Sequence, residues 1–486
     1  MSRIPFRRAS ARVLLLAALG VAPAFAADKP ATPEQAKALE AFFSGVVPKP
    51  APGQPPSITV KPDGSAYVVS FDVSALNGLF KARTGAVVYD PAVIVYRLFE
   101  QDDGKWRAEM GALPKIVAHA DDVTTTMDVR NLSQTLLVDP AIAWWTAGSA
   151  TADGASSTSH GPGVDQTVTS GAIKADYKST VGADGAVSSM ATESLSDVAI
   201  KMSATDKERP PVNIDGRFGS IGFDLGFDGL KTRKLFDLLT LISAHRDDLG
   251  PQADAIKAAL RDLAAPGVKL AEGVEAEKAL FSSPYGGIAL GGAKVGLAAA
   301  NAGKDSSLGV TVNADGLSLP VGLAPPGAAD LTPSRIDIAA TLKGFDMSAA
   351  ASAAIDRLRI GGGGPVLNDE DMSNVAGALL SAGPLRIEIA PSHIVAPAID
   401  ADLQGAVRYD MGKTSGALTI RLRGFDKTMA AVSKLSPDIQ RKALPAMAMA
   451  KGLAKSESDG ALSWVVEVGA DRSITVNGIP LGRAPD

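Results

Sequence analysis

The stretch ALTIRLRGFDKTMAAV, residues 417–432, contains the strand-to-helix transition that decides the fold. Leu418, Ile420 and Leu422 alternate with polar residues, which is the period of a β-strand with one buried face. The alternation ends at Gly424-Phe425-Asp426, and the residues that follow have helical composition. This stretch therefore predicts a strand that runs through a sharp corner into a helix.

The same corner recurs twice upstream. Gly226-Phe227-Asp228 and Gly344-Phe345-Asp346 also follow strand-like segments, and Ser70-Phe71-Asp72 is a looser copy. Glycine permits a sharp exit from the strand, phenylalanine anchors the corner in apolar surroundings, and aspartate caps the amides of a following helix. The copies are unevenly spaced, so we expect two or three related sheet-and-helix units rather than a regular solenoid.

Other turns are marked by Asp-Gly pairs. Pro62-Asp63-Gly64, Asp102-Asp103-Gly104 and Ala183-Asp184-Gly185 each separate two segments of alternating apolar residues, which predicts three β-hairpins. Thr32 and Asn368 stand at positions typical of helix N-caps. The fold class predicted is α+β, with extended, twisted antiparallel sheets built from hairpins and with helices packed on part of one face.

The chain divides into five predicted segments. Residues 1–26 form a signal peptide, and residues 27–56 form a helix and a proline-rich linker. Residues 57–225 form a β-meander, in which residues 146–171 are expected to be a mobile loop because Ala, Ser, Thr, Gly and Asp dominate them. Residues 226–333 combine a helix pair with glycine-rich strands, and residues 334–486 form a strand, helix and hairpin unit.

The signal peptide predicts export. Four arginines precede the apolar run Val13–Val21, which ends in Ala24-Phe25-Ala26 and is too short to span a bilayer. Its removal lowers the formal charge from −5 to −9, which argues against a nucleic-acid partner. The chain contains no cysteine, so disulfides and thiolate sites are excluded. We expect a periplasmic protein with no membrane span after cleavage.

The final residues carry a family resemblance. Leu462, Trp464, Val466 and Val468 alternate before a turn and a closing hairpin that ends near Leu481. From Asp337 to Leu481, this order of elements resembles an uncharacterised exported family, found mainly in alphaproteobacteria and known only as a domain of unknown function. The resemblance implies a periplasmic, strand-rich protein. It implies no catalytic residue.

No catalytic, cofactor-binding or metal-binding residue is predicted, and no cofactor is expected. The four histidines, His119, His160, His245 and His393, have no zinc-site spacing, and Ser392-His393 lacks a nucleophile-elbow motif. The many Val, Ile and Leu strand faces favour a noncatalytic envelope protein that offers an apolar sheet surface or groove to a lipid or a hydrophobic partner. One alternative is a structural protein that docks another envelope protein. An exported hydrolase is the other, and it requires one of these histidines to meet carboxylates or a serine in a cleft.

Overall fold

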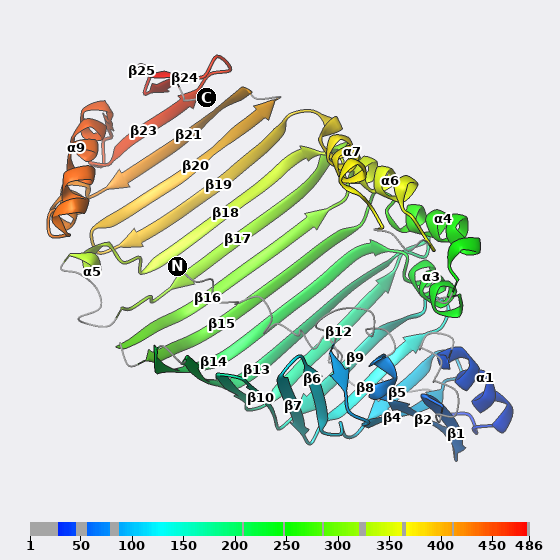
Figure 1. The fold of residues 1–486 in the computed structure, drawn as a ribbon. Coiled ribbons are helices and arrows are strands. Elements are labelled where there is room, and N and C mark those ends of the chain that lie inside the picture. Colours follow the sequence, from blue (N-terminus) through cyan, green and yellow to red (C-terminus); the bar gives the residue numbers. More distant parts are fainter. Residues whose placement is uncertain are drawn as a thin grey trace.

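The protein folds around one very large open sheet. The computed structural model describes residues 28–44, 56–77, 87–206, 209–245, 248–283, 286–319, 327–361, 366–410 and 413–483. Within them every strand belongs to a single antiparallel sheet, and Figure 1 shows β14 to β21 side by side across its centre. The predicted α+β class with an extended antiparallel sheet is confirmed. The predicted signal peptide and most of the proline-rich linker lie outside the described residues.

The strands lengthen toward the middle of the chain. Those before β13 are short: β1 (Ile58–Asp63), β2 (Ala66–Asp72), β3 (Val88–Tyr89), β4 (Val93–Glu100), β5 (Trp106–Met110), β6 (Ile116–Ala120), β7 (Val123–Arg130), β8 (Ser133–Asp139), β9 (Trp144–Ala152), β10 (Gly154–Gly161), β11 (Val164–Ser170) and β12 (Ile173–Val181). From β13 onward the strands are mostly longer: β13 (Val187–Asp206), β14 (Arg209–Leu230), β15 (Lys269–Ser283), β16 (Gly286–Ala300), β17 (Ser306–Asp315), β18 (Arg335–Phe345), β19 (Leu385–Ala396), β20 (Ile399–Asp410), β21 (Lys413–Arg423), β22 (Lys455–Ser456), β23 (Leu462–Val468), β24 (Ser473–Val476) and β25 (Ile479–Arg483).

The helices lie mainly at the ends of the strands. Figure 1 shows α3, α4, α6 and α7 in a row along one end of the strands, with α5 and α9 at the opposite end. The α-helices are α1 (Pro33–Ser44), α3 (Thr232–Ala244), α4 (Ala253–Leu263), α5 (Ala328–Leu331), α6 (Met347–Arg357), α7 (Asp369–Leu379), α8 (Phe425–Val432) and α9 (Pro437–Leu453). Short 3-10 turns are η1 (Val73–Leu76), η2 (Gly250–Gln252), η3 (Gly303–Asp305) and η4 (Leu380–Ala382).

The sheet is forked at β13. From β13 to β21 each strand pairs with the next in sequence. On its other edge, the first half of β13 pairs with β12, and the second half pairs with β11. One branch continues through β9, β8, β5, β4 and β2 to β1, and the other continues through β10, β7 and β6 to β3. The predicted segment boundary at residues 225 and 226 falls inside β14.

The turns and helix caps indicated by short sequence motifs have the predicted structures. The three Asp-Gly turns close the hairpins β1–β2, β4–β5 and β12–β13, as predicted. The Thr32 hydroxyl accepts the Gln35 amide at 3.2 Å at the start of α1. Asn368 and Asp371 form a reciprocal capping box on α7, so the predicted N-cap at Asn368 is confirmed.

The predicted mobile loop at residues 146–171 is wrong. These residues form most of β9 and all of β10 and β11, and each of these strands pairs with neighbours on both sides. Ala150 and Ala152 are buried, and the Ser159 and Thr125 hydroxyls bond at 2.9 Å across the β10–β7 pair. Small residues suffice here because neighbouring strands satisfy the backbone groups, a contribution that composition alone does not reveal.

Interruptions of the strand pairing line up across the sheet. Asp197 in β13 and Lys278 in β15 adopt left-handed φ angles of 48° and 51°. Between them, Gly219 in β14 lies where an added Cβ would be 3.3 Å from the Lys278 Cβ. Ladder interruptions of this kind bend strands and increase their twist. We infer that this aligned row curves the sheet.

Candidate functional site

Strand register separates the sheet into two faces of opposite chemistry. Because side chains alternate across a strand, residues paired in register lie in rows on one face. One row runs through Phe223, Val274, Val295, Val312 and Ile338 on β14 to β18. These five residues are apolar, which places an apolar face on the sheet.

Neighbouring rows extend this apolar face. Leu308, Leu342, Ile387 and Val407 stand side by side on β17 to β20. Leu297, Val310, Ala340 and Ile389 form the row between them and the first, and this row continues to Glu272 on β15 and Leu225 on β14. At about 4.8 Å per strand, the face from β14 to β21 is roughly 34 Å wide. We call it the apolar face.

The centre of the apolar face is open. Leu225, Leu270, Leu297 and Leu308 are between 44% and 54% exposed, and Val274, Val295 and Ile387 are exposed as well. Single exposed leucines are ordinary, but a contiguous apolar patch marks a binding surface. This open centre is the candidate site.

Packed elements cover the two ends of the apolar face. At one end, Ala36 of α1 packs with Val60, Tyr67 and Leu98 in a buried cluster. At the other, Phe425 of α8 packs with Trp464, and Met447 of α9 packs against the same cluster. The covered ends supply much of the buried core.

Charged and polar side chains occupy the opposite face. Glu275, Lys294, Asn313, Asp337, His393, Asp402 and Arg421 form one row across β15 to β21. Lys294 bonds Glu275 at 3.0 Å, Asn313 donates to Asp337 at 3.0 Å, and His393 bonds Asp402 at 2.7 Å. The hydrogen bond from Asn313 holds the pKa of Asp337 below its usual range, with help from Arg335. This polar face is suited to water.

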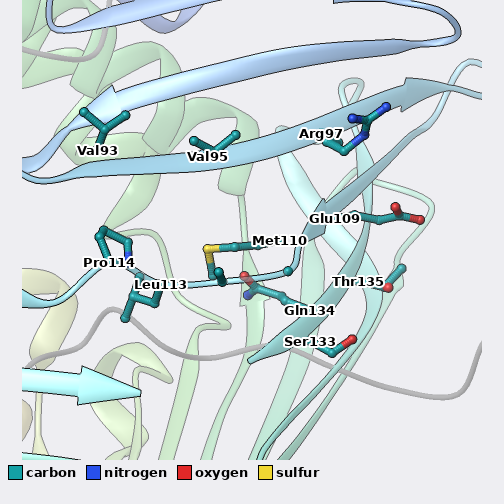
Figure 2. Close-up of a pocket in the computed structure, with 12 residues that line it drawn as sticks. Val93, Val95, Arg97, Glu109, Met110, Leu113, Pro114, Ser133, Gln134 and Thr135 are labelled. Carbon is teal, nitrogen blue, oxygen red and sulfur yellow. The ribbon is translucent and has the colours of Figure 1, made fainter. Parts of the chain in front are cut away.

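A hollow lies beside the fork of the sheet. β5 ends at Met110 while β4 continues back to Val93, so a space of about 770 Å³ opens beyond their last pair. Figure 2 shows Val93 and Val95 on β4 across from Leu113 and Pro114, with Met110 close to Leu113. Arg97, Glu109 and Gln134 also line the hollow, so its surface is partly polar.

The sheet from β15 onward matches the model of a known family. Residues 262–485 match the model of a family described as an uncharacterized protein conserved in bacteria (DUF2125). The match, which we call the DUF2125 region, covers a little less than half of the chain. The predicted resemblance to a domain-of-unknown-function family is thereby confirmed, whereas export remains a prediction. Comparisons with curated proteins and with solved structures gave no match. The DUF2125 region contains strands β15 to β25, and therefore most of the open apolar face.

The Gly-Phe-Asp copies have three different structures, two of them inside the DUF2125 region. Gly226-Phe227-Asp228 lies within β14, where Asp228 bonds Lys269 at 3.0 Å and caps no helix. Gly344-Phe345-Asp346 has the predicted form: Phe345 is buried, and the Asp346 carboxylate accepts the Ala349 amide at 2.8 Å at the start of α6.

In the third copy, Gly424 caps α8 in a left-handed conformation and buried Phe425 begins the helix. Asp426 pairs with Lys451 at 2.5 Å instead of capping. The prediction that aspartate caps every corner is therefore wrong for Asp228 and Asp426, since tertiary cations compete for these carboxylates.

The histidines lie apart from one another on open strands or helix ends. His119 contacts Thr124 at 3.0 Å and Asp90 at 3.2 Å, and exposed His160 contacts Asp165 at 2.9 Å. His245 follows α3, and His393 belongs to the polar face. Among the described residues, no cluster of three potential metal ligands occurs. No helix in the described part of the chain is long and apolar enough to cross a membrane.

Proposed function

We propose that this protein is a noncatalytic envelope protein that binds lipid acyl chains on the open part of its apolar face. The observation that carries the proposal is the exposure of in-register aliphatic rows from β14 to β19. The sequence features of export support a periplasmic location, where envelope lipids are the abundant apolar ligands.

The composition of the face favours acyl chains over a protein partner. Its rows are built mainly from Val, Leu, Ile and Ala, with Phe223 and Glu272 as exceptions, and the β14–β18 rows carry no arginine or tryptophan. Protein interfaces concentrate binding energy in Trp, Tyr and Arg. A peptide could not add a strand here, because central strands already pair on both sides. An acyl chain needs only apolar contact.

The energy available to an acyl chain is large. Each methylene removed from water contributes about 0.8 kcal/mol. A chain laid along Leu270, Leu297 and Leu308 would also remove those half-exposed side chains from water. Losses of ligand and side-chain entropy reduce this gain, so we expect micromolar rather than picomolar affinity.

A charge placed in the face tests the proposal. The full mature chain is titrated with the neutral probe N-phenylnaphthylamine, whose fluorescence rises in apolar surroundings. Leu297→Asp should weaken probe binding at least tenfold, because binding would remove from water a new carboxylate that lies between Val310 and Glu272. Ala298→Asp, one residue along β16 on the opposite face, is the matched control and should change binding less than twofold.

The same variants distinguish acyl-chain binding from other ways in which the apolar face could be occupied. Equal losses in both variants would refute specific binding at the apolar face. A wild-type dimer in analytical ultracentrifugation that Leu297→Asp converts to monomer would show that a second copy covers the face. Lipid found by mass spectrometry in organic extracts of the purified wild-type chain, but reduced in Leu297→Asp, would support acyl-chain binding.

A further inference from the structure

Two carboxyl groups interrupt the apolar rows: Glu272 lies between Leu225 and Leu297 in the open part, and Glu193 lies where the covered part of the face meets the open part. Glu193 stands in the middle of β13, paired with Ala175 on one side and Phe223 on the other. Ala175 is 7% exposed, whereas Phe223 is 41% exposed. Glu193 itself is half-buried. It therefore marks the boundary between core and open face.

Glu193 has no partner among the described residues, in contrast to acids on the polar face. Glu275 pairs with Lys294 at 3.0 Å, and Glu388 pairs with Lys343 at 2.6 Å. No hydrogen bond or ion pair joins Glu193 to another residue that the structure describes, and burial raises its pKa above the ordinary value of 4.5. An unpaired acid in apolar surroundings is costly, so its presence calls for a compensating group.

A second unpaired polar group adjoins it. Tyr177 on β12 pairs with Ala191, two residues before Glu193, so the two side chains are diagonal neighbours on one face. The Tyr177 hydroxyl is buried with no hydrogen-bond partner in the described chain, and the residue is only 4% exposed. The negative charge of Glu193 adds to burial in raising the pKa of Tyr177. Polar groups without partners gather at this boundary.

We propose that Glu193 binds the ammonium group of a lipid headgroup whose acyl chains lie over Phe223, Val274 and Val295. This inference rests on the proposed function and names the class of headgroup that the bound lipid carries. The carboxylate accepts hydrogen bonds and attracts a cation, and the described chain supplies no cation to it. An anionic headgroup at this position would be repelled. The apolar rows beginning at Phe223 receive the chains.

Competition between two short-chain lipids tests the assignment. The full mature chain is loaded with N-phenylnaphthylamine and titrated with dihexanoyl phosphatidylethanolamine or dihexanoyl phosphatidylglycerol, both below their micellar concentrations. We expect the ammonium lipid to displace the probe at about tenfold lower concentration, the scale of one charged hydrogen bond. Glu193→Gln, which keeps the side-chain size, should reduce this preference to within about twofold.

Glu275→Gln is the matched control, because it makes the same change on the polar face of β15. It should leave the tenfold preference intact. An unchanged preference in Glu193→Gln, or equal displacement by both lipids in the wild type, would overturn the role of Glu193 while leaving acyl-chain binding standing. Absence of probe binding to the wild type would instead refute the proposed function and this inference together.

Discussion

The substitution Tyr→Phe should change the free energy of unfolding in opposite directions at two buried tyrosines. Tyr177 and Tyr67 are 4% and 2% exposed, so their rings are equally withdrawn from water. The Tyr177 hydroxyl is buried and has no hydrogen-bond partner among the described residues, whereas the Tyr67 hydroxyl accepts the Thr32 amide at 3.1 Å. Tyr→Phe removes only the hydroxyl, which makes the two sites a matched pair.

The expected magnitudes follow from hydrogen-bond energetics. An unsatisfied buried hydroxyl costs about 1–3 kcal/mol, and a satisfied one contributes about 1 kcal/mol. Tyr177→Phe should therefore raise the free energy of unfolding by about 1 kcal/mol. Tyr67→Phe should lower it by about 1 kcal/mol, because the Thr32 amide at the start of α1 loses its acceptor.

Urea titration followed by far-ultraviolet circular dichroism measures both changes. The two variants should displace the unfolding midpoint in opposite directions at unchanged slope. If Tyr177→Phe destabilises the protein by as much as Tyr67→Phe, the Tyr177 hydroxyl has a partner in solution, and the unsatisfied boundary beside Glu193 does not exist. That result would remove one of the two supports for headgroup binding there.

Three further outcomes are expected. Asp346→Ala removes the cap of α6 and should cost about 1 kcal/mol in a urea titration, whereas Asp426→Ala, which removes an exposed ion pair and no cap, should cost less than about 0.5 kcal/mol. Gly344→Ala places a Cβ against the Pro384 carbonyl at a left-handed φ of 84° and should lower the melting temperature far more than Gly64→Ala, whose φ is 64° but whose Cβ position is open. The raised pKa of Glu193 means that the folded state holds a proton the unfolded state has released, so the contribution of Glu193 to stability falls as pH rises above 4.5. Glu193→Gln lacks this loss, and its advantage over wild type in urea titrations should grow from about pH 4 to about pH 8. A constant difference across that range would contradict the assignment.

Local elements could be predicted from the sequence because their causes are local. The Asp-Gly turns, the Asn368 cap and the Asp346 cap each depend on residues within a few positions of one another. The prediction of a mobile loop at residues 146–171 failed for the opposite reason. Strands on both sides stabilise a segment whose own composition is that of a loop.

The sequence predicted that the candidate site is an apolar strand face, but not where on the sheet it lies. Alternating Val, Ile and Leu indicated apolar strand faces, but which face stays open depends on what packs over it. Glu193 was missed because one acid among polar neighbours gives no signal until register aligns it with Ala175 and Phe223. The glutamate in ATESLSD, residues 191–197, does stand at an inward position of its strand, which is the only sequence cue available.

A single-layer sheet needs a reason for its exposed apolar face. Most antiparallel sheets bury one face against a second layer and leave the other to water. Here the polar face is completed by cross-strand pairs such as Lys294–Glu275 and His393–Asp402, so it gains nothing from a cover. Among the described residues, helix α1 packs at one end of the apolar face, and α8 with α9 packs at the other. The rows between them stay exposed although covering them would be favourable, and a surface that must admit and release an apolar ligand has this property.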